Sequence, residues 1–138
     1  MNSSMGRILR RLDSFAIKSA MPAFGKNNML KPEEIVAVAN YVRSLAGLSA
    51  RPGIDLAAGK KVFADNCAAC HGADGKGNQE LGAPNLTDRI WLYGPDEATI
   101  IETITNSRSG VMPAWAGRLD PGTIKALAVY VHTLGGGK

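Results

Sequence analysis

The sequence contains no apolar run that approaches the roughly 18 to 20 residues needed to cross a bilayer. It has only two cysteines in 138 residues, so no disulfide framework can be built from them. No Ser/His/Asp set and no close pair of carboxylates stands out, which leaves hydrolytic and general acid–base catalysis without candidates. Residues 1–20 carry basic side chains but no apolar stretch after them, so they are not predicted to be a secretory signal.

The excess positive charge of the chain lies in its N-terminal part. The formal net charge is +4, yet residues 1–50 hold seven Lys/Arg against three Asp/Glu, while residues 51–138 hold nine against nine. A nucleic-acid-binding surface requires a cluster or stripe of basic residues on the folded part of a protein. No nucleic-acid partner is therefore predicted.

One segment of the sequence occurs twice, as MPAFGKNNMLKPEEIVAVANYVRSL from residue 21 and as MPAWAGRLDPGTIKALAVYVHTL from residue 112. Both copies begin with Met-Pro-Ala and a large aromatic residue, and both continue with apolar residues at helical spacing. The density and order of the matches indicate an internal repeat. After a two-residue gap the matched pairs are Leu30/Leu119, Pro32/Pro121, Ile35/Ile124, Ala37/Ala126, Ala39/Ala128, Tyr41/Tyr130, Val42/Val131, Leu45/Leu134 and Gly47/Gly136.

Helical periodicity is also found between the two copies. Helices are predicted in each copy of the repeat, over residues 55–71 and over residues 97–106. Asp120 is a good N-cap for the last helix, whereas Lys31 is a poor cap in the first copy. Gly135 is expected to end the last helix. No stretch alternates at period two for long enough to predict a strand, so the expected fold class is all-α with long loops.

The strongest chemical signal is the run Cys67-Ala68-Ala69-Cys70-His71. On a helical turn this spacing places two sulfurs and an imidazole on one side. Two thioether bonds to Cys67 and Cys70 would hold the edge of a haem, and His71 would reach its iron, which is the usual meaning of C-x-x-C-H. Half of a zinc site and a thioredoxin-like dithiol are alternatives. The first lacks a second Cys/His pair and the second lacks a βαβ context.

Met112 is the candidate for the second axial ligand of the iron. Thioether sulfur is a soft ligand, and together with His it raises the reduction potential of a haem. Pro113 would stiffen the loop that presents this side chain. The alternative is that Met112 fills space in the core. The other histidine, His132, matches Arg43 in the repeat and is expected at the surface.

The segments GKKVFADNCAACHGADGKG, GAPNL, MPAW and LAVYVHTL resemble class I cytochromes c. The fold implied is three to five helices around one covalently attached haem, with the first and last helices crossing at Gly59, Phe63 and Tyr130. NQELGAPNLTD, WLYG, VMPAWAGRL and ALAVYVHTLGGGK are similar to the C-terminal haem domain of the cbb3-type cytochrome c oxidase subunit III. The resemblance covers residues 21–138 and leaves out residues 1–20.

That family has two haem domains in tandem behind an N-terminal membrane anchor. By this resemblance, residues 21–47 are the tail of a first haem domain whose C-x-x-C-H half is missing, residues 48–54 are a linker, and residues 55–138 are a cytochrome c domain. Residues 1–20 stay unassigned. The chain is expected to be a truncated or internally started version that binds one haem c. Met21 is expected to bind no iron, in a loosely docked helix.

Further residues are implied by the resemblance as the environment of the haem. The carbonyl of Pro84 is expected to take the proton of the second nitrogen of His71, which would orient the ring and raise its basicity; the alternative is an ordinary turn proline. Trp91, Tyr93 and Arg108 could line the haem or meet its propionates, and Trp115 could contact it. Each of these side chains could equally serve ordinary packing.

The function implied is transfer of single electrons, because a six-coordinate iron leaves no open site for a substrate. By resemblance, electrons would come from a donor cytochrome c and pass to the catalytic subunit of a terminal oxidase, beside its monohaem subunit, at the periplasmic face of the inner membrane. The chain itself would not reduce oxygen. A free-standing periplasmic carrier, the cytochrome part of a dehydrogenase and a peroxidase-like haem protein are the alternatives.

Overall fold

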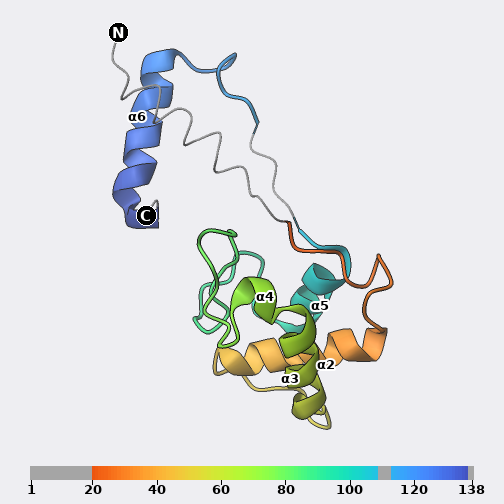
Figure 1. The fold of residues 1–138 in the computed structure, drawn as a ribbon. Helices are drawn as coiled ribbons and strands as arrows, with labels where there is room; N and C mark the ends of the chain where they lie inside the picture. Colours follow the sequence, from red (N-terminus) through yellow and green to blue (C-terminus); the bar gives the residue numbers. More distant parts are fainter. Residues whose placement is uncertain (1–19, 109–112, 137–138) are drawn as a thin grey trace. The chain divides into compact units, whose positions relative to one another are not determined.

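The computed structural model describes residues 20–108 and 113–136, and the chain divides into two units, residues 1–108 and 109–138. Each unit is described by itself. The first contains α2 (Pro32–Leu45), α3 (Leu56–Asn66), α4 (Ala68–His71) and α5 (Glu97–Asn106), and the second contains α6 (Pro121–Val131) and a π-helical turn, η1 (His132–Gly136) (Figure 1). The described residues form no strand, apart from one isolated bridge between Asn78 and Ala83. The fold is all-α and consistent with a class I cytochrome c, as predicted.

None of the helices in the described part of the chain is long and apolar enough to span a membrane.

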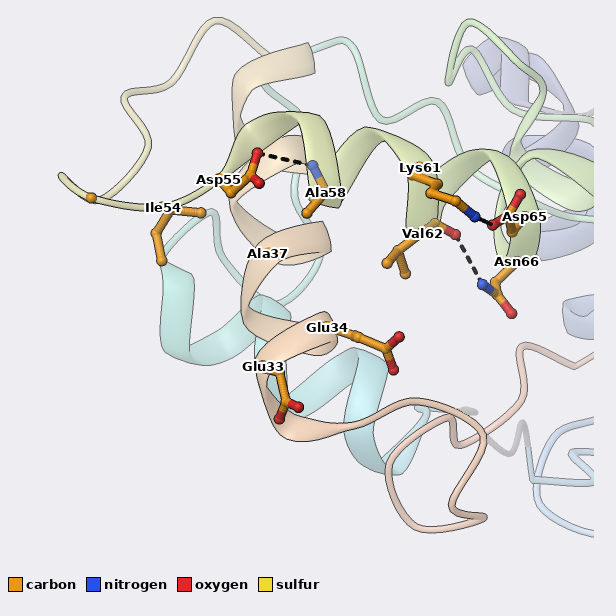
Figure 2. Close-up of a pocket in the computed structure, with 11 residues that line it drawn as sticks. Glu33, Glu34, Ala37, Ile54, Asp55, Ala58, Lys61, Val62, Asp65 and Asn66 are labelled. Carbon is orange, nitrogen blue, oxygen red and sulfur yellow. Dashed lines mark hydrogen bonds and ion pairs between the residues drawn. The ribbon is translucent and has the colours of Figure 1, made fainter.

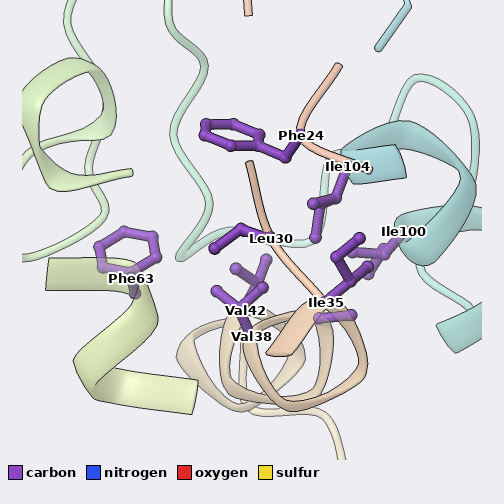
Figure 3. Packing of buried hydrophobic residues seen from close by; sticks show 9 residues of the cluster. Phe24, Leu30, Ile35, Val38, Val42, Phe63, Ile100 and Ile104 are labelled. Carbon is purple, nitrogen blue, oxygen red and sulfur yellow. The ribbon is translucent and has the colours of Figure 1, made fainter. Parts of the chain in front are cut away.

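The core of the first unit is built around α2. Its apolar residues recur at three- and four-residue spacing, so they form one face of the helix. Figure 3 shows this face meeting residues of α3, of α5 and of the segment before α2. Val38 and Ala39 are completely buried. The buried cluster comprises Phe24, Leu30, Ile35, Val38, Ala39, Val42, Phe63, Ile100 and Ile104.

Helix α2 packs against α3 at a glycine. A Cβ atom added to Gly59 would lie 2.3 Å from the carbonyl oxygen of Ala37 and 2.9 Å from the Cβ atom of Tyr41, so only glycine permits this backbone approach. One turn further along α3, the ring of Phe63 lies 5.4 Å from that of Tyr41 at an interplanar angle of 60°. The expectation of a loosely docked helix is therefore wrong, because α2 provides four of the nine residues of the buried cluster.

A buried amide fastens α2 to its surroundings. Asn40 is completely buried, and its Nδ2 donates to Oε1 of Glu97, at the start of α5, over 2.8 Å. The backbone N–H of Arg51 donates to Oδ1 of Asn40 over 2.8 Å. Both ends of the amide are satisfied, as a buried polar group requires. Sequence reasoning did not single out Asn40; its one signal is a lone amide within an apolar helix.

The expected helix over residues 55–71 is divided into α3 and α4 at Cys67. Asp55 begins α3, and its carboxylate accepts hydrogen bonds from the N–H groups of Ala57 and Ala58. Cys67 lies between the two helices, as the C-cap of α3 and the N-cap of α4, with φ −110° and ψ −33°. Helix α5 has the predicted bounds, and Asp96 caps it through the N–H of Thr99.

In the described part of the second unit, residues 113–136, a short loop is followed by α6 and η1. Asp120 caps α6 as predicted, by accepting hydrogen bonds from the N–H groups of Gly122 and Thr123. Helix α6 ends at Val131, and the chain continues through the π-helical turn η1 instead of remaining α-helical up to Gly135. No residue of α6 is buried. His132 is exposed, as expected.

Candidate functional site

The C-x-x-C-H run occupies one helical turn at the junction of α3 and α4. The N–H groups of Cys70 and His71 both donate to the carbonyl of Cys67, over 3.2 and 2.9 Å. Both cysteines are free thiols and partly buried. The turn therefore presents two unpaired sulfurs and the imidazole from five consecutive residues, as the motif predicts.

The loop after His71 is shaped by a glycine and by the isolated bridge. The N–H of Gly77 donates to the carbonyl of His71 over 2.7 Å, and Asn78 and Ala83 exchange two backbone hydrogen bonds of 2.9 and 3.0 Å. Gly77 has φ +84°, and an added Cβ would lie 2.5 Å from the carbonyl oxygen of Ala83. Only glycine fits there without strain. Because of this bridge, the residue after Ala83, Pro84, lies beside His71.

The imidazole of His71 is oriented by the carbonyl of Pro84. Nδ1 of His71 lies 3.1 Å from this oxygen. A carbonyl can only accept, so in this hydrogen bond the proton sits on Nδ1 and Nε2 keeps its lone pair. Iron-binding histidines are commonly held in this way by a second partner. The hydrogen bond implied by the resemblance is present, and the role of Pro84 towards a haem stays a prediction.

The thiol of Cys67 is partly buried. Burial, and in second place the neighbouring Cys70, raise the pKa of the Cys67 thiol to about 11. Cys67 is therefore a neutral thiol at neutral pH. Its side chain packs against the buried cluster of the first unit.

Trp91 supplies an unpaired donor beside the same cluster. Its indole packs against the buried residues, and its buried Nε1 has no hydrogen-bond partner among the described residues. An N–H left in this state costs about 1 to 3 kcal/mol, so it calls for an acceptor. A haem propionate is such an acceptor. The free thiols, the oriented imidazole and this donor together fit a covalently attached haem.

Tyr93 and Arg108 are brought together by the fold. The guanidinium carbon of Arg108 lies 4.4 Å from the centre of the Tyr93 ring, a cation–π arrangement. Nε of Arg108 also donates to Oγ1 of Thr103 over 3.0 Å. Both side chains are exposed. Their proposed contact with a haem stays a prediction.

The two remaining candidates lie elsewhere. Met112 falls outside the described residues. Trp115 belongs to the second unit, where it is partly exposed and the guanidinium carbon of Arg118 lies 5.6 Å from its ring centre. The described residues contain no group of three or more His, Cys, Asp or Glu able to hold a metal ion.

A separate pocket of about 480 Å³ lies between α2 and α3 (Figure 2). Its lining includes the apolar side chains of Ala37 and Val62, together with the charged side chains of Glu33, Glu34 and Lys61. Lys61 is engaged by Asp65 on the next turn of α3, over 2.6 Å. None of the residues of the C-x-x-C-H run lines this pocket.

Several proteins with curated descriptions are similar to this chain over most of its length. A cbb3-type cytochrome c oxidase subunit FixP of Bradyrhizobium sp. (strain ORS 278) is 74% identical over 118 residues, which are 86% of this chain and 41% of the relative. The FixP subunit of Azorhizobium caulinodans is 60% identical over 132 residues, 94% of this chain and 44% of the relative. The CcoP subunit of Cereibacter sphaeroides is 51% identical over 126 residues, which are 91% of this chain and 43% of the relative. The chain thus spans about four-tenths of the length of these relatives.

The part of the chain that carries the site also matches a protein family. Residues 55–131 match the family described as cytochrome c oxidase, cbb3-type, subunit III. The match begins at the N-cap of α3, includes the C-x-x-C-H turn and the Pro84 loop, and ends with the last residue of α6. The chain belongs to the family of cbb3-type cytochrome c oxidase subunit III.

Proposed function

We propose that this chain transfers single electrons through one haem c, attached by thioether bonds at Cys67 and Cys70. The observation that carries the proposal is the 3.1 Å hydrogen bond from His71 to the carbonyl of Pro84, beside two free thiols on the same turn. It leaves Nε2 of His71 with a lone pair for iron. The haem, when bound, supplies the one-electron chemistry.

The protein's own residues hold and shield the group. His71 would bind the iron, and the carbonyl of Pro84 would hold the proton of the imidazole on Nδ1. The indole N–H of Trp91, a buried donor without a partner among the described residues, would donate to a haem propionate. The buried cluster excludes water from one side of the site. Tyr93 and Arg108 would form part of the edge of the haem site.

A methionine thioether is proposed as the second axial ligand, and the sequence names Met112 for this role. With His71 and a methionine both bound, the haem would have no open position for a substrate, so the chain would pass electrons and would not reduce oxygen itself. The ligand pair also raises the reduction potential, which suits a site that accepts electrons late in a respiratory chain.

The setting proposed is a cbb3-type cytochrome c oxidase, since the relatives are named as its subunits FixP and CcoP. Electrons would arrive from a donor cytochrome c and leave towards the catalytic subunit, beside the monohaem subunit. The site would face the periplasm at the inner membrane. A free-standing carrier would use the same site, and co-purification with the oxidase separates the two.

The test is to express the full chain behind a cleavable export leader in a host that matures c-type cytochromes. A pyridine haemochrome assay is expected to give one haem per chain, and its reduced spectrum is expected to show thioether attachment at both cysteines. Cys67→Ala and Cys70→Ala should each leave a single thioether, with a shifted spectrum. A colourless wild-type product, or two haems per chain, would refute the proposal.

A further inference from the structure

The end of α5 brings the side chain of Arg108 back onto its own helix. Ser107, the C-cap residue of α5, has φ +61° and ψ 163°, a positive-φ conformation that residues other than glycine rarely adopt. Its N–H donates to the carbonyl of Thr103 over 2.9 Å. Directly after this turn, Nε of Arg108 donates to Oγ1 of Thr103 over 3.0 Å. Backbone strain of this kind persists only where surrounding contacts determine it, and it is concentrated at functional sites.

The hydroxyl of Thr103 is itself anchored to α5. It donates to the carbonyl of Thr99, one turn earlier, over 2.9 Å, and it accepts from Nε of Arg108. A hydroxyl can donate one hydrogen bond and accept another at the same time, so the two bonds are compatible. Thr103 is partly buried within the helix, whereas Arg108 is exposed. The helix therefore determines where Nε of Arg108 lies.

Tyr93 holds the same guanidinium from a second direction. The guanidinium carbon of Arg108 lies over the ring, 4.4 Å from its centre, so the ring covers one face of the planar group. An arginine has five N–H donors, and Thr103 uses only the one on Nε. Arg108 forms no ion pair with any of the described residues. The two terminal nitrogens of a guanidinium held in this way can bind both oxygens of a carboxylate.

The contact with Tyr93 also places Arg108 close to the proposed haem site. Tyr93 follows Trp91 by two residues, and two residues of extended chain span at most about 7 Å. Trp91 packs against the buried cluster that Cys67 also contacts, and its buried Nε1 has no partner among the described residues. The indole N–H and the guanidinium therefore come from one short stretch of chain and from the residue stacked on it. The propionate side chains of a haem end in carboxylates, which suit both donors.

We propose that Thr103 is a positioning residue: it holds the guanidinium of Arg108, stacked on Tyr93, so that the terminal nitrogens bind a haem propionate. The proposal rests on the proposed function, since it requires a haem at Cys67 and Cys70. Sequence reasoning did not single out Thr103. A fixed positive charge beside the haem disfavours the oxidised, more positive state of the iron, so it raises the midpoint potential. Thr103 contributes to this potential through Arg108.

The experiment measures the midpoint potential of the haem-loaded full chain in a double-mutant cycle of Thr103→Val and Arg108→Gln. Valine has nearly the shape of threonine and lacks the hydroxyl, whereas glutamine removes the positive charge. Each single variant is expected to lower the potential, Arg108→Gln by more. Because Thr103 acts through Arg108, Thr103→Val should cause no further shift in the Arg108→Gln background. Thr103→Ser keeps the hydroxyl and should retain the wild-type potential. An unchanged potential in Thr103→Val, or additive shifts in the double variant, would overturn the proposal.

Thr105→Val is the matched control, because it removes a hydroxyl from the same helix and none of the hydrogen bonds of Arg108. Its potential should equal that of the wild type, and a shift as large as that of Thr103→Val would contradict the proposal. A second measurement covers a Thr103→Val chain that fails to fold. In the reduced, haem-loaded wild type the Nε–H NMR signal of Arg108 should be protected from exchange with water, and an unprotected signal would also overturn the proposal. Failure of the proposed function has a different signature, namely no covalent haem in the wild type by the haemochrome assay.

Discussion

Helices α2 and α6 arise from two copies of one sequence pattern, yet their surroundings differ. Helix α2 contacts α3 and α5, and five of its residues are buried. Helix α6 has only η1 beside it within its own unit, and none of its residues is buried. The difference teaches that an apolar stripe predicts a helix and its buried face, while the partner on that face is chosen by particular side chains and by close backbone approach.

The largest expected effect comes from placing the same charge on matched positions of the two helices. Val38 is completely buried, whereas its counterpart Leu127 is 47% exposed. Val38→Asp would bury an unpaired carboxylate, which costs about 3 to 5 kcal/mol and would remove most of the stability of an ordinary domain. Leu127→Asp is expected to stay within about 0.5 kcal/mol. Urea denaturation of the full haem-free chain, followed by far-ultraviolet circular dichroism, measures both.

Because the two variants change the net charge equally, the difference between them isolates burial. A loss of stability in Leu127→Asp as large as that in Val38→Asp would break the comparison, since α6 would then be as buried as α2.

A smaller effect is expected from exchanging residues between the copies at the position of Asn40. The second copy has Val129 there, which is 63% exposed. Asn40→Val would remove the acceptor of the Arg51 N–H and the donor to Glu97, at a cost of about 1 to 3 kcal/mol. The reverse change, Val129→Asn, is expected to stay within about 0.5 kcal/mol. The midpoints of thermal unfolding give both values, and equal shifts would contradict the difference between the copies.

The sequence predicted the local structure well, because local structure depends on nearby residues. The bounds of α5, the cap at Asp120 and the single turn that holds Cys67, Cys70 and His71 all follow from short-range patterns. The hydrogen bond from His71 to Pro84 was reached only through resemblance, since nothing in the spacing of these two residues implies it.

The choice of partner for α3 could not be predicted from periodicity, because both copies of the repeat have the same apolar stripe. What distinguishes the first copy is spread over distant positions: the amide of Asn40 with its bonds to Arg51 and Glu97, and the bonds from Phe24 to the end of α5. Such contacts exist only once the chain is folded. The break between α3 and α4 at Cys67 could not be predicted either, because no glycine or proline occurs at that position.

The smallest expected effect concerns the start of α6, where Asp120 titrates. Hydrogen bonds from the side chain and backbone of Thr123, and from the N–H of Gly122, lower the pKa of the Asp120 carboxyl below its usual 3.8. A lowered carboxyl pKa contributes stability at neutral pH that is lost as the pH falls through the folded-state pKa. The first turn of α6 should therefore fray on acidification, which the amide NMR signals of Gly122 and Thr123 would report. Asp120→Asn keeps an acceptor that does not titrate, so the turn should then stay intact down to acid pH. Equal fraying in Asp120→Asn and the wild type would show that some other group controls the start of α6.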